Sequence, residues 1–247
     1  MSDVTSASLI GLELTQMPVV LITGANRGLG LEFARQYQAD GWRIFAACRD
    51  QNSAGELQQL AKHGSGKLTV LPMDVTDAAS IRKAAAQLED VSLDLVINNA
   101  GIIGVSGQRA GNVDYASWAR VLDVNTMGPL RVLEAFIEHI ARSERRLVVT
   151  ITSGMGSIGD NTTGGSIAYR ASKAAANMVM RSAAIDLAPR RIICVVVNPG
   201  WVKTDMGGPG ATLTPLESVT ALRRLIETLG PSNSGKFYHY DGSEYPW

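Results

Sequence analysis

Residues 19–30 have the sequence VVLITGANRGLG, in which an apolar run leads directly into a glycine-rich segment. The run is typical of a buried parallel strand, and Leu29, Phe33 and Tyr37 follow it at helical spacing. We therefore expect the glycines at a strand-to-helix turn, where unpaired backbone N–H groups and the helix dipole attract a pyrophosphate. The Gly-x-x-x-Gly-x-Gly spacing departs from the Gly-x-Gly-x-x-Gly dinucleotide fingerprint, so on this stretch alone a simple glycine-rich loop is an alternative.

Strand-like apolar runs recur along the chain, with helical stretches between them. They cover residues 19–23, 43–48, 68–71, 93–98, 147–152, 192–198 and 237–240. Strict alternation predicts parallel strands joined by right-handed crossovers, with helices on both faces of the sheet. We expect an α/β fold of the Rossmann type, a doubly wound, seven-stranded parallel sheet with its ligand cleft outside the carboxyl ends of the strands. Residues 17–247 then form a single domain, and residues 1–16, which have no place in the pattern, are expected to be a disordered extension.

The composition narrows the class of protein. The 247 residues are 45% hydrophobic, enough for one large core, and 23 Lys plus Arg balance 23 Asp plus Glu. This balance gives no sign of a nucleic-acid partner or of an anionic membrane surface. The sequence contains neither a membrane-spanning apolar run nor a signal peptide, so we expect a cytoplasmic protein. Cys48 and Cys194 are expected to be buried free thiols, and the histidines lack metal-ligand spacing, so no metal is expected.

Tyr169 and Lys173 carry the clearest chemical signal. They lie four residues apart in an alanine-rich stretch that favours helix, and so share one helix face. Lowering a phenol pKa from about 10 to about 7 takes roughly 4 kcal/mol, which an ammonium and a cationic nicotinamide ring could supply together in a dry cleft. Such a tyrosine can serve as a general acid. A packed tyrosine beside a surface lysine is the alternative, but the glycine turn, Ser153 and residues 98–101 (NNAG) favour a nicotinamide-dependent site.

Together these motifs resemble the short-chain dehydrogenase/reductase family, and the resemblance extends from Met17 to Trp247. Residues 199–208, the glycine-rich stretch before Tyr169 and the ending at 240–242 look most like the sniffer-type carbonyl reductases and the bacterial C-factor proteins. The resemblance implies an oxidoreductase that reduces a carbonyl to an alcohol. A cofactor-binding signalling module of the C-factor type with little or no turnover, and an epimerase or dehydratase of the same fold, are alternatives.

The end of the second strand indicates which cofactor is used. An acidic side chain there binds the adenosine ribose, whereas an arginine accommodates a 2′-phosphate. The strand is followed by Arg49, and Arg27 lies in the glycine turn, so two guanidinium groups could hold one phosphate. NADP(H) is therefore favoured over NAD(H). Asp50 is the contrary feature, because it could pair with Arg49 or bind the ribose itself.

The resemblance implies further cofactor-binding residues, which gather at strand ends and helix starts. In the glycine turn these are Gly24, Asn26, Arg27, Leu29 and Gly30. The other residues follow later strands. Asp74 and Val75 border the adenine, Asn99 and Ala100 lie along the cofactor, and Val202 and Thr204 hold its carboxamide. A helix cap is the alternative role for Asp74.

The family's catalytic tetrad corresponds to Asn125, Ser153, Tyr169 and Lys173. By resemblance, Tyr169 protonates the carbonyl oxygen and Ser153 polarises the carbonyl. Lys173 lowers the tyrosine pKa and holds the nicotinamide ribose. Thr150, Thr152 and Ser157 lie close to Ser153, whose position just past the fifth strand favours it.

Asn125 has a signal of its own in Pro129, which lies four residues later in a helical stretch expected from Trp118 to Ile140. Proline has no N–H and cannot bond the carbonyl four residues back. The Asn125 carbonyl oxygen is then left to hold the water of the family's proton relay. A kinked helix without a catalytic role is the alternative.

Substrate and partners are less well defined. Only residues 205–213 precede the capping box at Thr214, so any lid is short, and residues 154–165 form a glycine-rich wall. Such an open site suits a range of aldehydes, ketones or quinones.

The apolar residues at 130–137 and 174–180 exceed what one sheet face covers, which predicts a homodimer or homotetramer. Packing of these helices on their own sheet alone is the alternative.

Overall fold

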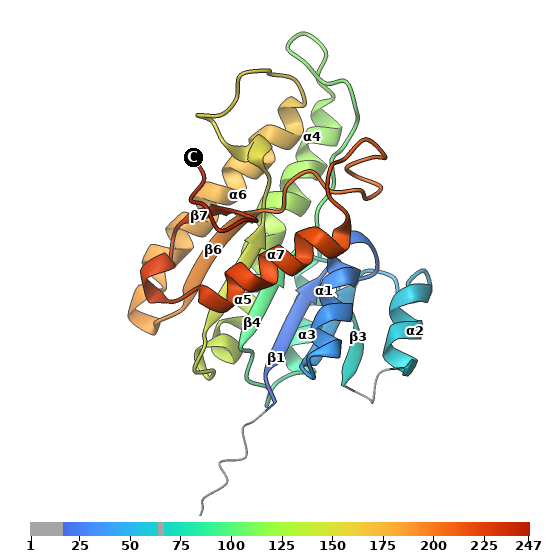
Figure 1. The fold of residues 1–247 in the computed structure, drawn as a ribbon, viewed down its shortest axis with the longest axis vertical. Helices are drawn as coiled ribbons and strands as arrows, with labels where there is room; N and C mark the ends of the chain where they lie inside the picture. The colour runs from blue at the N-terminus through green and yellow to red at the C-terminus, as the bar shows by residue number, and fades with distance from the viewer. Residues whose placement is uncertain (1–16, 64–66) are drawn as a thin grey trace, which may run out of the picture.

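The computed structural model describes residues 17–63 and 67–247 (Figure 1). Seven strands form one sheet in the order β3-β2-β1-β4-β5-β6-β7, and each strand is parallel to its neighbours. Their bounds are β1 Val19–Thr23, β2 Arg43–Cys48, β3 Leu68–Pro72, β4 Leu95–Asn98, β5 Leu147–Ile151, β6 Ile193–Asn198 and β7 Phe237–His239. This is the Rossmann-type doubly wound sheet that the sequence predicts. The extension expected over residues 1–16 lies outside the described residues.

The predicted strands differ from the observed ones only at their ends. β4 begins at Leu95 rather than at Leu93, because the Leu93 N–H donates to the carbonyl oxygen of His139 (3.0 Å) instead of joining the sheet. β7 ends at His239, whose N–H donates to the Ser243 carbonyl oxygen (2.8 Å) as the chain turns back. Apolar character alone does not mark where a ladder of hydrogen bonds stops.

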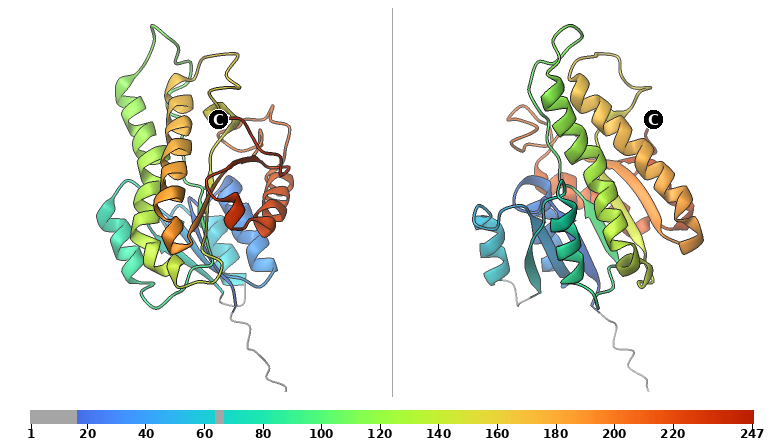
Figure 2. Two further views of the ribbon diagram at one scale, coloured as in Figure 1. Left: turned by 90° about the vertical axis from the view of Figure 1, so that its left-hand side faces the viewer. Right: turned by 180° about the vertical axis from the view of Figure 1, so that it is seen from behind.

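Helices cover both faces of the sheet, as the two further views show (Figure 2). One buried cluster packs α1 (Gly28–Ala39), α2 (Gly55–His63) and α7 (Pro215–Thr228) against the sheet. A second cluster packs α3 (Ala78–Ala86), α5 (Gly128–Ala141) and α6 (Ile167–Asp186) against the opposite face. The remaining helix, α4 (Tyr115–Leu122), lies beside α6. The sheet is thus buried on both sides, which accounts for its near-continuous apolar strands.

The expected helical stretch from Trp118 to Ile140 begins earlier, at Tyr115, and is interrupted by a π-helical turn at Asp123–Met127. Pro129 lies at the start of α5, directly after this turn. Because proline cannot donate within the α-helical ladder, the helix widens for one turn before it resumes. Asn125 lies in the middle of the π-helical turn.

Local signals in the last helix are confirmed. Thr214 caps α7 by accepting from the Glu217 N–H (3.2 Å), and the Glu217 carboxylate accepts from the Thr214 N–H (2.8 Å). This reciprocal pair is the capping box that the sequence predicts.

Cys48 and Cys194 are both buried free thiols. Within residues 17–63 and 67–247, no helix is both long and apolar enough to cross a membrane, and no group of metal-ligating side chains converges.

Candidate active site

The glycine turn after β1 is packed tightly against the turn after β4. Gly24 has a φ of 62°, and a Cβ built on it would lie 2.8 Å from the Ala100 Cα. A Cβ on Gly30 would lie 2.3 Å from the Gly24 carbonyl oxygen and 2.5 Å from the Asn99 Nδ2. Only glycine fits at these two positions, so the turn can lie directly against the turn after β4.

Thr23, Asn99 and Ala100 join the two turns. The buried Thr23 hydroxyl oxygen accepts from the backbone N–H groups of Asn99 and Ala100, each at 3.0 Å. The Asn99 amide in turn donates to the carbonyl oxygens of Thr23 (2.9 Å) and Gly24 (3.0 Å). Asn99 and Ala100, predicted to follow the cofactor, therefore also fix the shape of the glycine turn.

The start of α1 fits a bound phosphate group. Its N-cap residue is Arg27, which makes no side-chain capping bond. The first backbone N–H groups of a helix have no partner within the helix, and here no side chain caps them. The turn therefore presents amide donors and a positive helix end, the donor set that a pyrophosphate requires. Asn26 and Leu29 flank this start and are half-buried.

The two arginines expected at the 2′-phosphate differ in their contacts. Arg49 is exposed, and its neighbour Asp50 uses its carboxylate locally, accepting from the Asn52 N–H (2.9 Å). Among the described residues no ion pair joins Arg49 to Asp50. Arg27 instead donates to the carboxylate of Asp205 at 2.6 Å, a contact that the sequence gives no reason to expect.

Asp74 is not a helix cap. Asp77 caps α3, accepting from the Ala79 N–H at 2.8 Å. The Asp74 carboxylate accepts instead from the Thr76 N–H (2.9 Å) and the Thr76 hydroxyl (2.7 Å). Val75 is buried and lies against the start of α5, where a Cβ on Gly128 would come within 3.2 Å of the Val75 Cβ. The turn after β3 is thus ordered by its own bonds.

Ser153 and Tyr169 bring two hydroxyl groups together beside the end of β5. Ser153 follows β5 and accepts from the Met155 N–H (3.1 Å), which leaves its own proton free to donate. Tyr169 lies in the first turn of α6 and is buried. Burial raises the pKa of Tyr169 to about 12, and its hydrogen bond with Ser153 partly opposes that rise.

The pKa of about 7 is expected when both Lys173 and a cationic nicotinamide ring lie beside the phenol. Within the protein itself, the loss of hydration around the buried phenol outweighs other effects and raises the pKa instead. The Lys173 Nζ lies 5.8 Å from the centroid of the Tyr169 ring and donates elsewhere. The chain's own groups thus keep Tyr169 protonated, as a proton donor must be.

Lys173 is the most unusual group in the site. It is 5% exposed, and its Nζ donates to the Ile151 carbonyl oxygen at 2.9 Å. Burial lowers the pKa of Lys173 to about 8. An ammonium carries three donors, so this single bond leaves two for ligand hydroxyl groups. Such a buried lysine is rare without a functional reason.

Asn125 holds the backbone on the other side of the site. Its side chain accepts from the Ile102 N–H (2.9 Å) and donates to the Ile102 carbonyl oxygen (2.8 Å). It also donates to the Ser172 hydroxyl (3.0 Å), which itself donates to the Tyr169 carbonyl oxygen (2.7 Å). The side chain of Asn125 therefore links the segment after β4 to the helix that carries Tyr169 and Lys173.

Val202 and Thr204 lie in the segment after β6. Val202 is buried, and a Cβ on Gly28 would lie 3.4 Å from the Thr204 Cγ2, which places Thr204 over the start of α1. Two residues further on, the Met206 sulfur lies 3.8 Å from the Tyr169 hydroxyl, which donates to it. Residues 205–213 form turns and bends, and α7 begins after them at Pro215.

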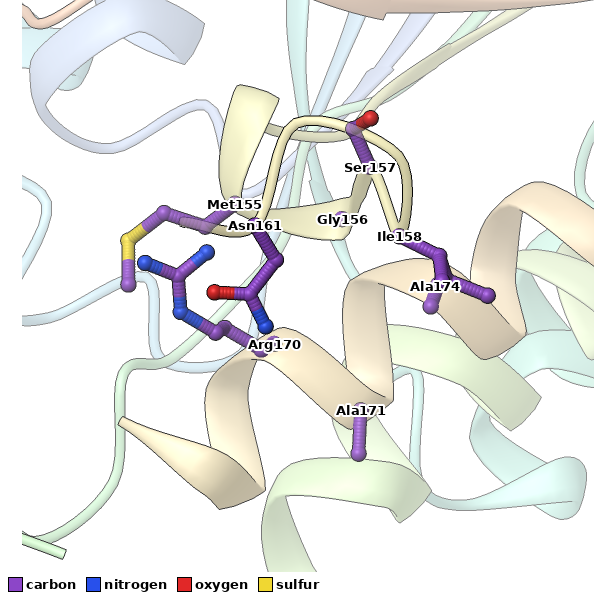
Figure 3. Close-up of a pocket in the computed structure, with 8 residues that line it drawn as sticks. All are labelled: Met155, Gly156, Ser157, Ile158, Asn161, Arg170, Ala171 and Ala174. Atoms are coloured by element: carbon purple, nitrogen blue, oxygen red, sulfur yellow. The ribbon is translucent and has the colours of Figure 1, made fainter. Parts of the chain in front are cut away.

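The loop after β5 also borders a separate hollow of about 280 Å³ (Figure 3). Its lining residues come from this loop and from the outer side of α6, and are Met155, Gly156, Ser157, Ile158, Asn161, Arg170, Ala171 and Ala174. Neither Ser153 nor Tyr169 lines it, so this hollow is not the candidate active site. The same loop is tied to the last residues, since the Tyr245 hydroxyl donates to Asp160 (2.7 Å) and the Gly159 N–H to the Trp247 carbonyl oxygen (2.8 Å).

Sequence reasoning missed four contributors, Thr23, Ser172, Asp205 and Met206. Thr23 and Ser172 do have a signal, since each is a polar residue in a segment that must be buried, where an unbonded hydroxyl would be costly. Asp205 and Met206 lie next to a predicted carboxamide-binding residue, but nothing local indicates that they contact Arg27 and Tyr169.

The fold and the site define a dinucleotide-type α/β protein with a Tyr–Lys pair at the carboxyl ends of its strands. The family model for short chain dehydrogenases matches residues 18–212, and the chain belongs to that family.

Individual relatives agree with the expected subgroups. The chain is 48% identical to C-signal of Myxococcus xanthus over 155 residues, which is 63% of this chain and 93% of that protein. It is similar to the NADPH-bound carbonyl reductase from chicken fatty liver, with 35% identity and a TM-score of 0.87 over 94% of this chain and 100% of the other. The carbonyl reductase Sniffer of D. melanogaster gives 34% identity and a TM-score of 0.87 over the same shares. The predicted resemblance is confirmed.

Proposed function

We propose that the protein is an NADP(H)-dependent oxidoreductase that reduces an aldehyde, ketone or quinone to an alcohol. The observation that carries the proposal is the convergence of the Ser153 and Tyr169 hydroxyl groups with the buried Lys173 ammonium, beside a helix start without a side-chain cap. The solved carbonyl reductase from chicken fatty liver, which is described as NADPH-bound, supports the same function.

Each residue then has a defined task. The amide groups at the start of α1 would bind the pyrophosphate, and the two remaining N–H groups of the Lys173 ammonium would donate hydrogen bonds to ribose hydroxyl groups. Bound NADPH supplies the hydride. Ser153 donates a hydrogen bond to the substrate carbonyl oxygen, and Tyr169 transfers its proton to that oxygen as negative charge develops there. Asn125 keeps the segment after β4 and helix α6 in register through Ile102 and Ser172.

Arg27 and Arg49 make NADP(H) the preferred cofactor. Both are exposed near the carboxyl ends of β1 and β2, whose residues pair in parallel register through Thr23 and Ala47. The local bond of Asp50 to Asn52 agrees with this preference, because it turns one of the two carboxylate oxygens toward the residues that follow β2. Two guanidinium groups without an acidic partner on β2 suit a phosphate better than a pair of ribose hydroxyls.

A panel of aldehydes, ketones and quinones, followed by the loss of NADPH absorbance, tests the proposal. We expect turnover of several carbonyl compounds, because the lid is short and the wall at residues 154–165 is rich in glycine. Turnover of one steroid or sugar alone would reject the broad substrate range, while leaving the reductase chemistry in place.

A signalling role without turnover is the second candidate, and the 48% identity to C-signal favours it. The same panel separates the two functions. Tight NADPH binding with no turnover on any carbonyl would favour the signalling module.

We also infer that two copies associate through the outer face of α6. Fewer apolar residues of α5 and α6 are left uncovered than the sequence predicts, because the chain itself buries Val132, Leu133, Phe136 and Met180. Met178 and Ile185 are nevertheless 66% and 64% exposed and lie two helical turns apart on one face. Light scattering at micromolar concentration should give a dimer or tetramer, and Met178→Glu should shift it toward the monomer. A monomeric wild-type protein would reject the association.

A further inference from the structure

The segment at residues 201–208, here called the strap, crosses the site from the start of α1 to the catalytic tyrosine. Three consecutive residues make the crossing. Thr204 packs over the start of α1 at Gly28, Asp205 accepts from Arg27 at 2.6 Å, and the Met206 sulfur accepts from the Tyr169 hydroxyl at 3.8 Å. One short piece of chain therefore contacts both the proposed phosphate-binding arginine and the proposed proton donor.

The strap is a single compact turn. The Trp201 indole N–H donates to the Gly207 carbonyl oxygen (2.8 Å), and the Gly208 N–H donates to the Thr204 carbonyl oxygen (2.8 Å). A Cβ on Gly207 would lie 2.0 Å from the Val202 carbonyl oxygen, so the backbone is folded closely on itself. A displacement of Asp205 is therefore transmitted to Met206.

We propose that Asp205 is a specificity-determining residue for the cofactor, and that it acts by competing with the adenosine 2′-phosphate for Arg27. This inference rests on the proposed NADP(H)-dependent function. A phosphate monoester carries a charge of about −1.5 to −2 at neutral pH. As it approaches Arg27 it either replaces the Asp205 carboxylate on the guanidinium or lies beside it as a like charge. In both arrangements Asp205 weakens the binding of a 2′-phosphate and leaves a nucleotide without one unaffected.

The strap gives this competition a second consequence. When the 2′-phosphate draws Arg27 away from Asp205, the strap loses its ionic contact at the start of α1 and keeps the packing of Thr204 beside Gly28, which allows Met206 to leave the Tyr169 hydroxyl. That hydroxyl is the group that the substrate carbonyl must reach. NADP(H) should therefore prepare the substrate position, whereas NAD(H), which has no 2′-phosphate, should leave the Arg27–Asp205 pair and the Met206 contact in place.

The decisive measurement is calorimetric binding of adenosine 2′,5′-bisphosphate and of adenosine 5′-monophosphate, which differ only in the 2′-phosphate. Exposed ion pairs contribute up to about 1 kcal/mol, so Asp205→Asn should tighten the bisphosphate about threefold to fivefold and change the monophosphate less than about twofold. The gain should shrink at high salt, because the pair is exposed. Asp90→Asn, an exposed substitution with the same change in net charge, should tighten neither nucleotide.

Trp201 fluorescence provides a readout of the strap itself. The bisphosphate should change the emission of the wild-type protein, the monophosphate should not, and the signal should vanish in Trp201→Phe and in Arg27→Ala. An equal effect of Asp205→Asn on both nucleotides, or none on either, would overturn the role of Asp205 while leaving the NADP(H) assignment intact. A wild-type protein that binds the two nucleotides equally would reject the NADP(H) preference and the role of Asp205 together.

Discussion

The proposed catalytic side of the site and its proposed phosphate-binding side are built in opposite ways. On the catalytic side, Asn125 and Lys173 are 1% and 5% exposed, and both are held by buried hydrogen bonds. On the phosphate side, the side chains of Arg27 and Asp205 are 65% and 77% exposed. Buried polar groups are fixed, because breaking their bonds leaves them without water, whereas an exposed ion pair exchanges partners at little cost. In the proposed function, the residues that carry out the chemistry are thus held in place before substrate binds, and the arginine proposed to contact the cofactor can change its partner.

The largest expected effect is on the catalytic side. Tyr169→Phe keeps the packed ring and removes the proposed proton donor, so carbonyl reduction should fall about 10²- to 10⁴-fold. NADPH affinity and the melting temperature should stay close to those of the wild type, because the partners of the Tyr169 hydroxyl among the described residues are a serine hydroxyl and a methionine sulfur. NADPH oxidation, nucleotide binding and thermal melting measure the three quantities. Near-normal reductase activity would reject the mechanism and favour the cofactor-binding module.

Lys173→Met should abolish activity and at the same time raise the free energy of unfolding. The pKa of Lys173 falls from 10.5 to about 8 through burial, so below pH 8 folding must bury a charge that water would hydrate. Between pH 8 and 10.5 the unfolded chain binds a proton that the folded chain does not, and the free energy of unfolding rises with pH across that range. Removing the charge should therefore stabilise the protein by about 1–3 kcal/mol at pH 7, part of the gain being offset by the lost bond to Ile151.

Urea unfolding at pH 7 and pH 10 measures this gain, which should be smaller at the higher pH. Lys83→Met, at an exposed position of α3, should show neither the gain nor its dependence on pH. Activity should be lost at the same time, because the ribose donors disappear. A Lys173→Met protein less stable than the wild type at pH 7 would mean that the ammonium is better solvated than its burial indicates.

The same contrast explains what the sequence could predict. The strands, the capping box at Thr214 and the Tyr169–Lys173 pair depend on residues only a few positions apart, and local patterns are visible in one chain. The bond between Asn125 and Ser172 spans 47 residues, and that between Arg27 and Asp205 spans 178. Neither has a local pattern. The direction of the Tyr169 pKa could not be predicted either, since desolvation depends on everything packed around the phenol.

On the phosphate side, Arg49→Asp tests the cofactor preference. Losing a charge-assisted hydrogen bond should weaken NADPH binding about 10- to 100-fold and change NADH binding little. Stability should be unaffected, because Arg49 is exposed and, among the described residues, makes no ion pair. Fluorescence titration with the two cofactors measures the ratio of affinities. Equal losses for both would show that Arg49 does not contact the 2′-phosphate.

The smallest effect is expected at Asp50, the residue that argues against NADP(H). If its carboxylate served the ribose hydroxyls, removing its charge would weaken NADH strongly. The carboxylate instead accepts from the Asn52 N–H, and the amide oxygen of Asp50→Asn can accept the same bond. Titration of this variant should therefore change the affinity for either cofactor less than about twofold, well below the 1.4 kcal/mol of a tenfold change. A large and selective loss of NADH affinity would show that Asp50 binds the ribose and would make NAD(H) the better cofactor. An acidic side chain would then hold the ribose hydroxyls, as in other dinucleotide-binding folds, in place of the exposed arginines proposed here to hold a phosphate.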